Sequence, residues 1–412
     1  MILNYIWVGF FLIAFVVAFI KLIFFQDMEV FPQMLESTFE MAKTGFQISI
    51  GLTGVMTLWL GLMKIGERGG MVAIMSRLVG PFFSRLFPEI PKDHPATGSV
   101  IMNFSANILG LDNAATPLGL KAMKELQEIN PNKDTASNAQ IMFLVLNTSG
   151  LTVIPISIIA DRTMLGSVNP TAIFIPTLLA TFCSTLIGLV YVCYKQNINL
   201  FDRVIAAYVL GLTSFIALCV WYFTKLSQEE LQRQSSLFTS IIIISIIASF
   251  LILGLRKRLS LFETFIEGAK EGFETSIKII PYLVAILVAI GVFKASGTLV
   301  YITEGIRWIV QLVGLNGDFV DALPVALLKP LSSQSARGMM ITIADAKNFG
   351  PDSFVGNLTS LFRGCADTTF YILAVYFGSV NIRKTRYAVT GGLIADLAGI
   401  VAAIFVGYLF FH

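Results

Sequence analysis

Amide, hydroxyl and carboxylate side chains recur inside strongly apolar segments of this 412-residue chain. Amides and hydroxyls both donate and accept hydrogen bonds, which suits recognition of a small polar solute, uncharged or zwitterionic. An ionised side chain at the centre of a bilayer costs about 2.5–3.5 kcal/mol on insertion scales, so each one needs a partner, a cavity or a role. The sequence therefore predicts a solute-binding site drawn from these residues: Asn103, Asn107, Asp112, Asn113, Thr116, Asn147, Thr148, Ser149, Ser332, Ser333, Gln334, Ser335, Asp367, Thr368, Thr369 and Asp396.

Several of these residues also have a structural interpretation. Asp367, like Asn138, stands where a helix N-cap would stand. Hydroxyls in the run Asn147–Ser149 can bond back to their own helix, although three adjacent polar side chains cover most of its faces. Asp396 belongs either to a solute or cation pathway or to a hydrogen bond with a neighbouring broken backbone. Both interpretations remain open at this stage.

The elements that must position these residues are transmembrane helices. The chain is 55% hydrophobic and 13% charged, with a mean hydropathy of +0.77. About 20 mostly apolar residues cross the hydrocarbon core of a bilayer. We expect an all-α integral membrane protein with about nine spans, at residues 2–25, 46–65, 138–160, 171–194, 204–223, 236–255, 274–295, 366–380 and 387–411.

Two apolar stretches are interrupted by polar residues and proline, and we expect both to be re-entrant. The first is interrupted between Asn103 and Pro117, and the second at Pro330 and over Ser332–Ser335. Backbone freed at membrane depth is tolerated where protein or water satisfies it, and paired interruptions indicate a transporter site. Surface loops between amphipathic helices are the alternative. Arg337 either clamps an anionic group or anchors a helix end at the outer interface, and the anchor is favoured.

The chain contains an internal repeat. Ala42–Phe46 (AKTGF) returns as Ala269–Phe273 (AKEGF), and Asn138–Leu146 aligns with Asp367–Val375 as a polar head followed by an apolar run. Ordered matches of this kind indicate a duplicated unit. We expect a first helix over residues 1–34, a repeat over 35–200, connecting helices over 201–260 and a second repeat over 261–412.

The distribution of basic residues predicts the orientation. Every second loop between the predicted spans lies on the same side of the membrane. One such set of loops holds most of the Lys and Arg, and we therefore expect that side to be cytoplasmic. The N-terminus is then cytoplasmic, the C-terminus is outside, and the two repeats run in opposite directions. Inverted repeats with broken helices form a pair of gates around a central solute.

Several functional classes are disfavoured. Two histidines and no paired cysteine spacing argue against a metal site, and no basic tract indicates nucleic acid. A phosphate-binding loop of the G-x-x-x-x-G-K-[ST] type is absent from the sequence, and no histidine lies in a predicted span to serve an enzyme. We expect no cofactor and no catalysis; a gradient of Na⁺ or H⁺ would drive any coupled transport.

The quoted strings also carry a family resemblance. In the first half they resemble spore maturation protein A: Pro95–Gly98 with Asn103 and Asn107, Leu109–Met123 and Asn130–Asn138. In the second half they resemble spore maturation protein B: Ala269–Phe273, Pro281–Ala285, Ala336–Met340, Gly350–Phe354 and Ala374–Ser379. The resemblance covers nearly the whole chain and implies a fusion of the two, within the nucleoside-recognition or gate domains that are similar to concentrative nucleoside transporters. The substrate-binding residues of those transporters have no counterpart here.

These observations lead to two functional hypotheses. The first is a secondary transporter in a bacterial inner membrane, for a small polar solute such as a nucleoside, an amino acid or a cell-wall metabolite. The second is a non-transporting membrane component that organises an envelope or spore-maturation-type complex. A homo-oligomer is compatible with both.

Overall fold

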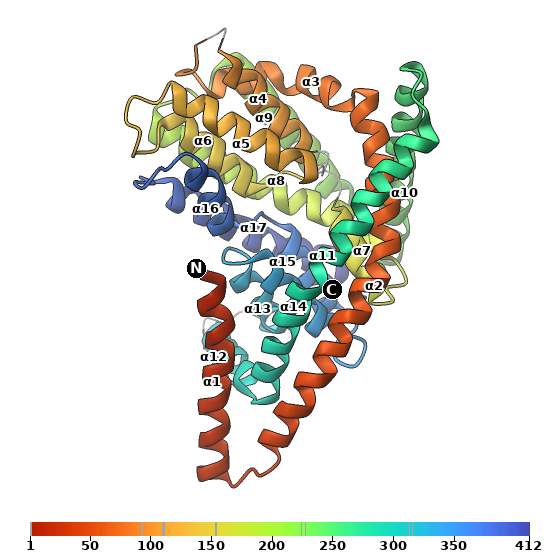
Figure 1. The fold of residues 1–412 in the computed structure, drawn as a ribbon, viewed down its shortest axis with the longest axis vertical. Coiled ribbons are helices and arrows are strands. Elements are labelled where there is room, and N and C mark those ends of the chain that lie inside the picture. The colour runs from red at the N-terminus through yellow and green to blue at the C-terminus, as the bar shows by residue number, and fades with distance from the viewer. Residues whose placement is uncertain are drawn as a thin grey trace. The chain divides into compact units, whose positions relative to one another are not determined.

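The computed structural model describes residues 2–91, 94–108, 112–152, 155–223, 225–226, 228–312, 314 and 316–412. All regular secondary structure in these residues is helical (Figure 1). An isolated bridge pairs Thr135 with Lys384. The all-α expectation is therefore confirmed for the described part of the chain.

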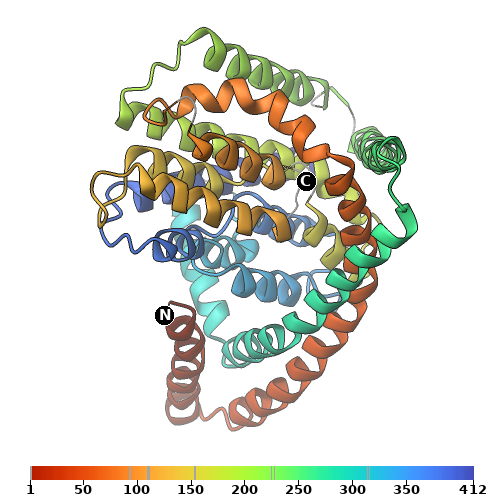
Figure 2. The same cartoon turned by 45° about the horizontal axis from the view of Figure 1, so that its top comes forward.

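After a first long helix, the first half of the chain contains a second long helix, an amphipathic helix, a pair of helices, two short helices and a third long helix. A tight turn at Gln26, which has φ +54°, connects the first two helices (Figure 2). The bounds are α1 Ile2–Phe25, α2 Val30–Gly69, α3 Met71–Leu86, α4 Pro95–Ile108, α5 Asp112–Glu128, α6 Asn138–Ser149, α7 Ile156–Met164, η1 Pro170–Ile173 and α8 Phe174–Gln196.

Two helices, α9 (Arg203–Phe223) and α10 (Gln228–Arg256), precede a second series in the same order as the first. The duplicated unit that the sequence predicts stays a prediction. The predicted alignment of Asn138 with Asp367 does not place them at matching helices. Asn138 begins the first of the two short helices in its series, whereas Asp367 precedes the second short helix in the other series. The bounds are α11 Leu261–Ala295, α12 Thr298–Leu312, η2 Asp318–Ala322, α13 Leu323–Leu328, α14 Ser333–Ala344, α15 Phe354–Gly364, α16 Thr369–Ser379 and α17 Ala388–Phe411.

Five described helices are long and apolar enough to cross a membrane: Trp7–Phe25, Pro170–Gln196, Arg203–Tyr222, Leu237–Arg256 and Ala388–Phe411. A sixth span results if Val284–Ala295 and Thr298–Leu312, which are bent by 69° to each other, count as one. These segments coincide with five of the predicted spans and part of a sixth. The chain is thus a multi-pass membrane protein, while nine spans and inverted repeats stay predictions.

The other predicted spans differ from the structure for local reasons. Residues 138–160 do not form one helix, because Gly150 ends α6 in the left-handed region at φ +54° and α7 begins only at Ile156. Residues 366–380 contain α16, whose 11 residues are about half of a span. Residues 46–65 lie inside the 40-residue helix α2, which continues beyond both ends of the predicted span.

The chain folds into two compact units, each built from separate stretches. Unit 1 comprises Met1–Gly61, Ser157–Pro170 and Gly268–Arg363, and unit 2 comprises Leu62–Ile156, Thr171–Glu267 and Gly364–His412. Unit 1 therefore holds α7 together with α12–α15, and unit 2 holds α3–α6 and α8–α10 together with α16 and α17. The units are packing divisions rather than sequence repeats, so the predicted repeat boundaries stay a prediction.

In unit 2, glycines allow α17 to pack closely on α6 and α8. A Cβ built on Gly391 would lie 2.8 Å from Val145, and one on Gly399 would lie 2.6 Å from the backbone oxygen of Cys365. Small residues at these positions let the helix backbones approach closely. Successive aromatic contacts connect α3 to α16 through the same core, from Phe83 to Phe104, Phe143 and Tyr376.

Candidate functional site

Three asparagines form a cluster in unit 2. Asn103 and Asn107 project from α4, and Asn147 from α6. Asn107 Nδ2 donates to Asn147 Oδ1 at 2.7 Å and lies 3.4 Å from Asn103 Oδ1, and Asn103 Nδ2 donates to the Ala115 carbonyl of α5 at 2.8 Å. Asn103 is fully buried, Asn147 is buried and Asn107 is half-buried. The cluster connects both helices of the α4–α5 pair to α6, as predicted for one site.

The run Asn147–Ser149 is held largely by its own helix. Asn147 Nδ2 donates to the Phe143 carbonyl at 2.7 Å. The hydroxyls of Thr148 and Ser149 donate to carbonyls three residues earlier, at 2.9 and 3.0 Å. The structural interpretation of these two hydroxyls as donors to their own helix is therefore confirmed. Asn147 differs from them, because its Oδ1 also accepts from Asn107.

A second buried polar contact joins α16 to α17. Thr369 Oγ1 donates to Asp396 Oδ2 at 2.7 Å, and both residues are buried. Gly392 lies beside them, since a Cβ built on it would lie 2.9 Å from Thr369 Oγ1 and 3.4 Å from Thr148 Oγ1. Hydroxyl and carboxylate oxygens thus gather in the interior of unit 2.

The expected capping positions are each shifted by one residue. Ser137 is the N-cap of α6 and forms a capping box with Gln140, so Asn138 is the first helical residue. Thr368 is the N-cap of α16, and Asp367 precedes it as an exposed residue whose Oδ1 accepts from the Thr368 N–H at 2.7 Å. The Asp367 N–H donates to the Thr148 carbonyl at 2.7 Å, which brings the start of α16 to the end of α6.

Three further predicted site residues, Asp112, Asn113 and Thr116, belong to α5. Thr116 is exposed on α5. The side chains of Asp112 and Asn113 lie outside the described residues.

Unit 2 also contains a cavity of about 560 Å³ between α3, α4, α6, α8 and α9. The amides of Asn107 and Asn147 line one part of it. Most of the remaining lining is aliphatic or aromatic, with Leu78, Phe82 and Phe182 as examples. Sequence reasoning missed this cavity, because its walls come from five helices whose apolar residues look like those of any span.

The second predicted cluster, Ser332–Ser335, lies in unit 1 at the break between α13 and α14. Ser332 caps α14, since its Oγ accepts from the Ser335 N–H at 3.2 Å. Ser335 Oγ and Gln334 Oε1 are buried and find no hydrogen-bond partner in the described part of the chain. The break and its polar side chains are as expected.

A charge cluster in unit 1 corrects the interpretation of Arg337. Arg337 Nε lies 3.0 and 3.1 Å from the two carboxylate oxygens of Asp161, and Arg363 Nη1 lies 2.5 Å from Asp161 Oδ2. The Asp161 side chain is 0% exposed, and both arginine side chains are 7% exposed. Arg337 is therefore a buried partner of Asp161, and its assignment as an interface anchor is wrong. Charged residues beside apolar runs were the available signal for Asp161 and Arg363.

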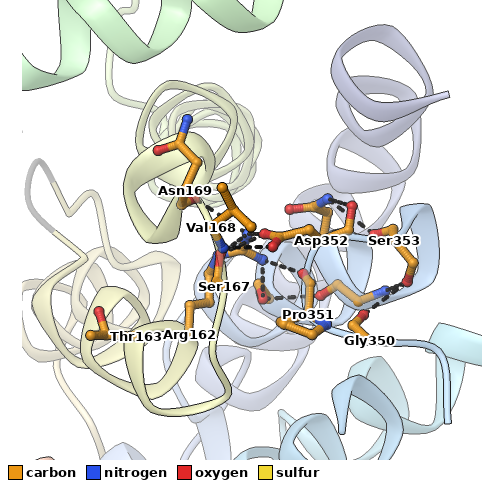
Figure 3. A network of polar contacts seen from close by, with 12 residues as sticks. Arg162, Thr163, Ser167, Val168, Asn169, Gly350, Pro351, Asp352 and Ser353 are labelled. Carbon is orange, nitrogen blue, oxygen red and sulfur yellow. Dashed lines mark hydrogen bonds and ion pairs between the residues drawn. The ribbon is translucent and has the colours of Figure 1, made fainter. Parts of the chain in front are cut away.

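A neighbouring ion pair fastens two loops of unit 1 (Figure 3). Arg162, which is buried, donates to the Pro351 carbonyl and to Asp352 Oδ1, each at 2.8 Å. Asp352 Oδ2 accepts from the Val168 N–H at 2.7 Å. Arg162 lies outside every candidate span; burial lowers its pKa to about 10 and Asp352 opposes the shift, so it is a cation at neutral pH.

Comparison with known proteins identifies the class of this chain. Residues 49–162 match the family described as Gate: nucleoside recognition. This stretch includes the asparagine cluster and the Asp161–Arg162 pair. The fold and the match together define an all-helical, multi-pass membrane protein with a gate domain. No solved structure matches the chain.

Two relatives specify the family. The chain is 50% identical to spore maturation protein A of Bacillus subtilis (strain 168) over 149 residues, which are 36% of this chain and 76% of that protein. It is 44% identical to spore maturation protein B of the same organism over 166 residues, which are 40% of this chain and 90% of that protein. The chain belongs to the family of spore maturation proteins A and B and matches both, as the sequence strings predicted.

Proposed function

We propose that this protein is a secondary transporter, working by alternating access, for a small polar solute such as a nucleoside, an amino acid or a cell-wall metabolite. The observation that carries the proposal is the cluster of buried Asn103 and Asn147 with half-buried Asn107, at the point where α6 ends. Buried amides beside a broken helix are a costly arrangement that transporters use to bind polar solutes. The gate-family match over the same residues supports it.

The recurring helix order supports an alternating-access architecture. Each series has a pair of helices with a polar break, α4–α5 and α13–α14, followed by two short helices. In the proposed topology, nine spans and two re-entrant pairs form inverted repeats in a bacterial inner membrane, with the N-terminus in the cytoplasm. Ser332–Ser335 would then act as the counterpart of the asparagine cluster.

The Thr369–Asp396 contact is the proposed coupling site for Na⁺ or H⁺. A buried carboxylate beside a hydroxyl supplies oxygen atoms that can bind a monovalent cation or take up a proton. Transport rather than catalysis is proposed.

A non-transporting role is the second candidate. Thr148 and Ser149 are already bonded to their own helix, which favours a structural role for those two residues. In this hypothesis the chain organises an envelope or spore-maturation-type complex. Alanine at the buried amides would then leave its activity in the cell unchanged, whereas substitutions on exposed surfaces would not.

Thermal unfolding of the purified protein with a solute panel tests the proposal. A solute that binds the folded state increases the free energy of unfolding, by about 2.7 kcal/mol at 100 times its Kd, and so raises the melting temperature. The panel holds nucleosides, amino acids and peptidoglycan fragments, each with and without Na⁺. We expect a stabilising solute whose effect is lost in Asn107→Ala and kept in Asn132→Ala, a substitution at an exposed loop residue.

Uptake of that solute into liposomes containing the protein is the decisive second measurement. Uptake that requires Asn107 and responds to a Na⁺ or pH gradient is the expected result. Stabilisation without uptake under any gradient would contradict transport and favour the complex-organising role.

A further inference from the structure

The cavity of unit 2 has the character of a ligand site. Its volume of about 560 Å³ lies within the range of roughly 300–1,000 Å³ that is typical of small-molecule sites. Such sites have mostly apolar walls and a few polar groups that orient the ligand. This cavity has that composition, since hydrocarbon and aromatic side chains surround the pair Asn107 and Asn147.

The cavity is lined by exposed apolar residues on one side. Leu78 of α3 is 60% exposed, and Leu212 and Phe215 of α9 are 40% and 55% exposed. The helix α9 is one of the candidate membrane spans, Arg203–Tyr222. Lining residues exposed on such a helix face hydrocarbon, so a ligand would enter from the bilayer rather than from water.

The polar end of the cavity has a free acceptor. Asn107 uses its Nδ2 to donate to Asn147, and Asn107 Oδ1 accepts no hydrogen bond within the described part of the chain. The other polar groups of the lining are committed, since Thr185 Oγ1 donates to the Ser149 carbonyl and the Tyr208 hydroxyl to the Leu78 carbonyl. A ligand that donates one hydrogen bond to Asn107 Oδ1 would satisfy this half-buried group.

We propose that the cavity binds a single-chain membrane amphiphile, with its hydrocarbon chain along α3, α8 and α9 and a hydrogen-bond-donating head at Asn107. This goes beyond the proposed function, because it assigns an amphiphile with an apolar body to the cavity beside the asparagine cluster, whether or not the protein transports a polar solute. The walls would contribute the binding energy of the chain. The amide pair would select the head.

The test uses the full-length protein in detergent and a long-chain fatty alcohol that carries a diazirine on its chain. After illumination, mass spectrometry locates the labelled residues. We expect saturable labelling on the cavity-lining residues of α3, α8 and α9. The unlabelled alcohol should compete, and a nucleoside should not.

A matched pair of glycine variants makes the test specific. Gly211 lines the cavity, and a Cβ built on it would meet no atom within 4 Å, so the leucine of Gly211→Leu can begin at the cavity wall without displacing the backbone. Gly305 of α12 is equally unobstructed and lies in unit 1. We expect Gly211→Leu to weaken labelling about tenfold, because the leucine occupies space that the chain would fill, and Gly305→Leu to leave it unchanged.

Asn107→Leu tests recognition of the head. The wild type should prefer the fatty alcohol to its methyl ether, which cannot donate, and the variant should bind both equally. Unsaturable labelling spread over all lipid-facing helices, unaffected by Gly211→Leu, would overturn the proposal. Saturable labelling of the cavity without uptake of any solute would refute transport but not the amphiphile site. Uptake that depends on Asn107, without saturable labelling of the cavity, would support transport and refute the amphiphile site.

Discussion

Asp161 is a single carboxylate that holds two buried arginines, Arg337 and Arg363, in the interior of unit 1. Charges in such an environment are tolerated only when they are paired, because removing them from water costs several kcal/mol per ion. The arrangement joins the three short helices α7, α14 and α15. Its stability therefore depends on the carboxylate more than on either arginine.

Asp161→Asn should destabilise the protein strongly. The substitution keeps the shape of the side chain but leaves two buried guanidinium groups without their anion, which costs about 3–5 kcal/mol when a buried pair is broken. Thermal unfolding in detergent measures the effect as a lowered melting temperature. Lys347→Ala is the control, because it breaks the exposed pair Lys347–Glu40 and should change nothing measurable. Equal effects of the two substitutions would contradict this account.

At the scale of elements, the breaks in the helices decide where polar groups lie. The α6 helix stops at Gly150, whose left-handed backbone places the Thr148 carbonyl against the Asp367 N–H. The α13–α14 break contains Pro330 and ends at the cap Ser332. Each break is thus produced by a residue that cannot continue a helix or that stabilises its next start.

Gly150→Ala should weaken the junction between α6 and α16. The new Cβ would stand in the left-handed region at φ +54°, 3.2 Å from the Asp367 nitrogen, so we expect a loss of about 1–2 kcal/mol. Gly378→Ala in α16 is the matched control, because its Cβ would meet nothing within 4 Å. Comparison of melting temperatures should show a decrease for the first variant alone. An unchanged melting temperature for Gly150→Ala would mean that the break relaxes without strain.

Two loops of unit 2 are joined by Asp134, and this contact predicts a pH dependence. The Asp134 carbonyl accepts from the Arg383 and Lys384 N–H groups, and hydrogen bonds from Thr135 and Lys384 lower the pKa of its carboxyl below the usual value of 3.8. A lowered pKa adds stability above the ordinary value and loses it as the pH falls through the folded-state value. The difference in melting temperature between wild type and Asp134→Asn should therefore be constant from neutral pH down to about 5 and shrink below about 4.

At the scale of the whole molecule, the proposed inverted topology places the loop at Asn132 in the cytoplasm and the loop at Val168 outside. Both residues are exposed, and Val168 is 94% exposed. In a background with the four native cysteines replaced, Val168→Cys should react with a membrane-impermeant maleimide on intact cells. Asn132→Cys should react only after the membrane is opened. The same labelling pattern at both positions would exclude the opposite orientation of the two loops.

The sequence by itself determined the class of this protein. Apolar runs of membrane-spanning length and the polar residues that interrupt them are local properties, so composition and order were enough to predict a helical membrane protein with broken helix pairs. The family of spore maturation proteins A and B was predicted from the resemblance of particular strings to that family. Asn103, Asn107 and Asn147 were identified because amides are rare in such runs and their cost requires an explanation.

Tertiary structure alone decided which of those groups meet. Asp161 pairs with Arg337, which is 176 positions away in the sequence, and with Arg363, which is farther still. No local sequence pattern predicts such a contact. The same holds for Thr369 with Asp396 and for the cavity, whose walls come from five helices. Burial also distinguished Asp367, which is exposed, from Asp396, which is not, because the exposure of a carboxylate depends on the helices packed around it rather than on its neighbours in the chain.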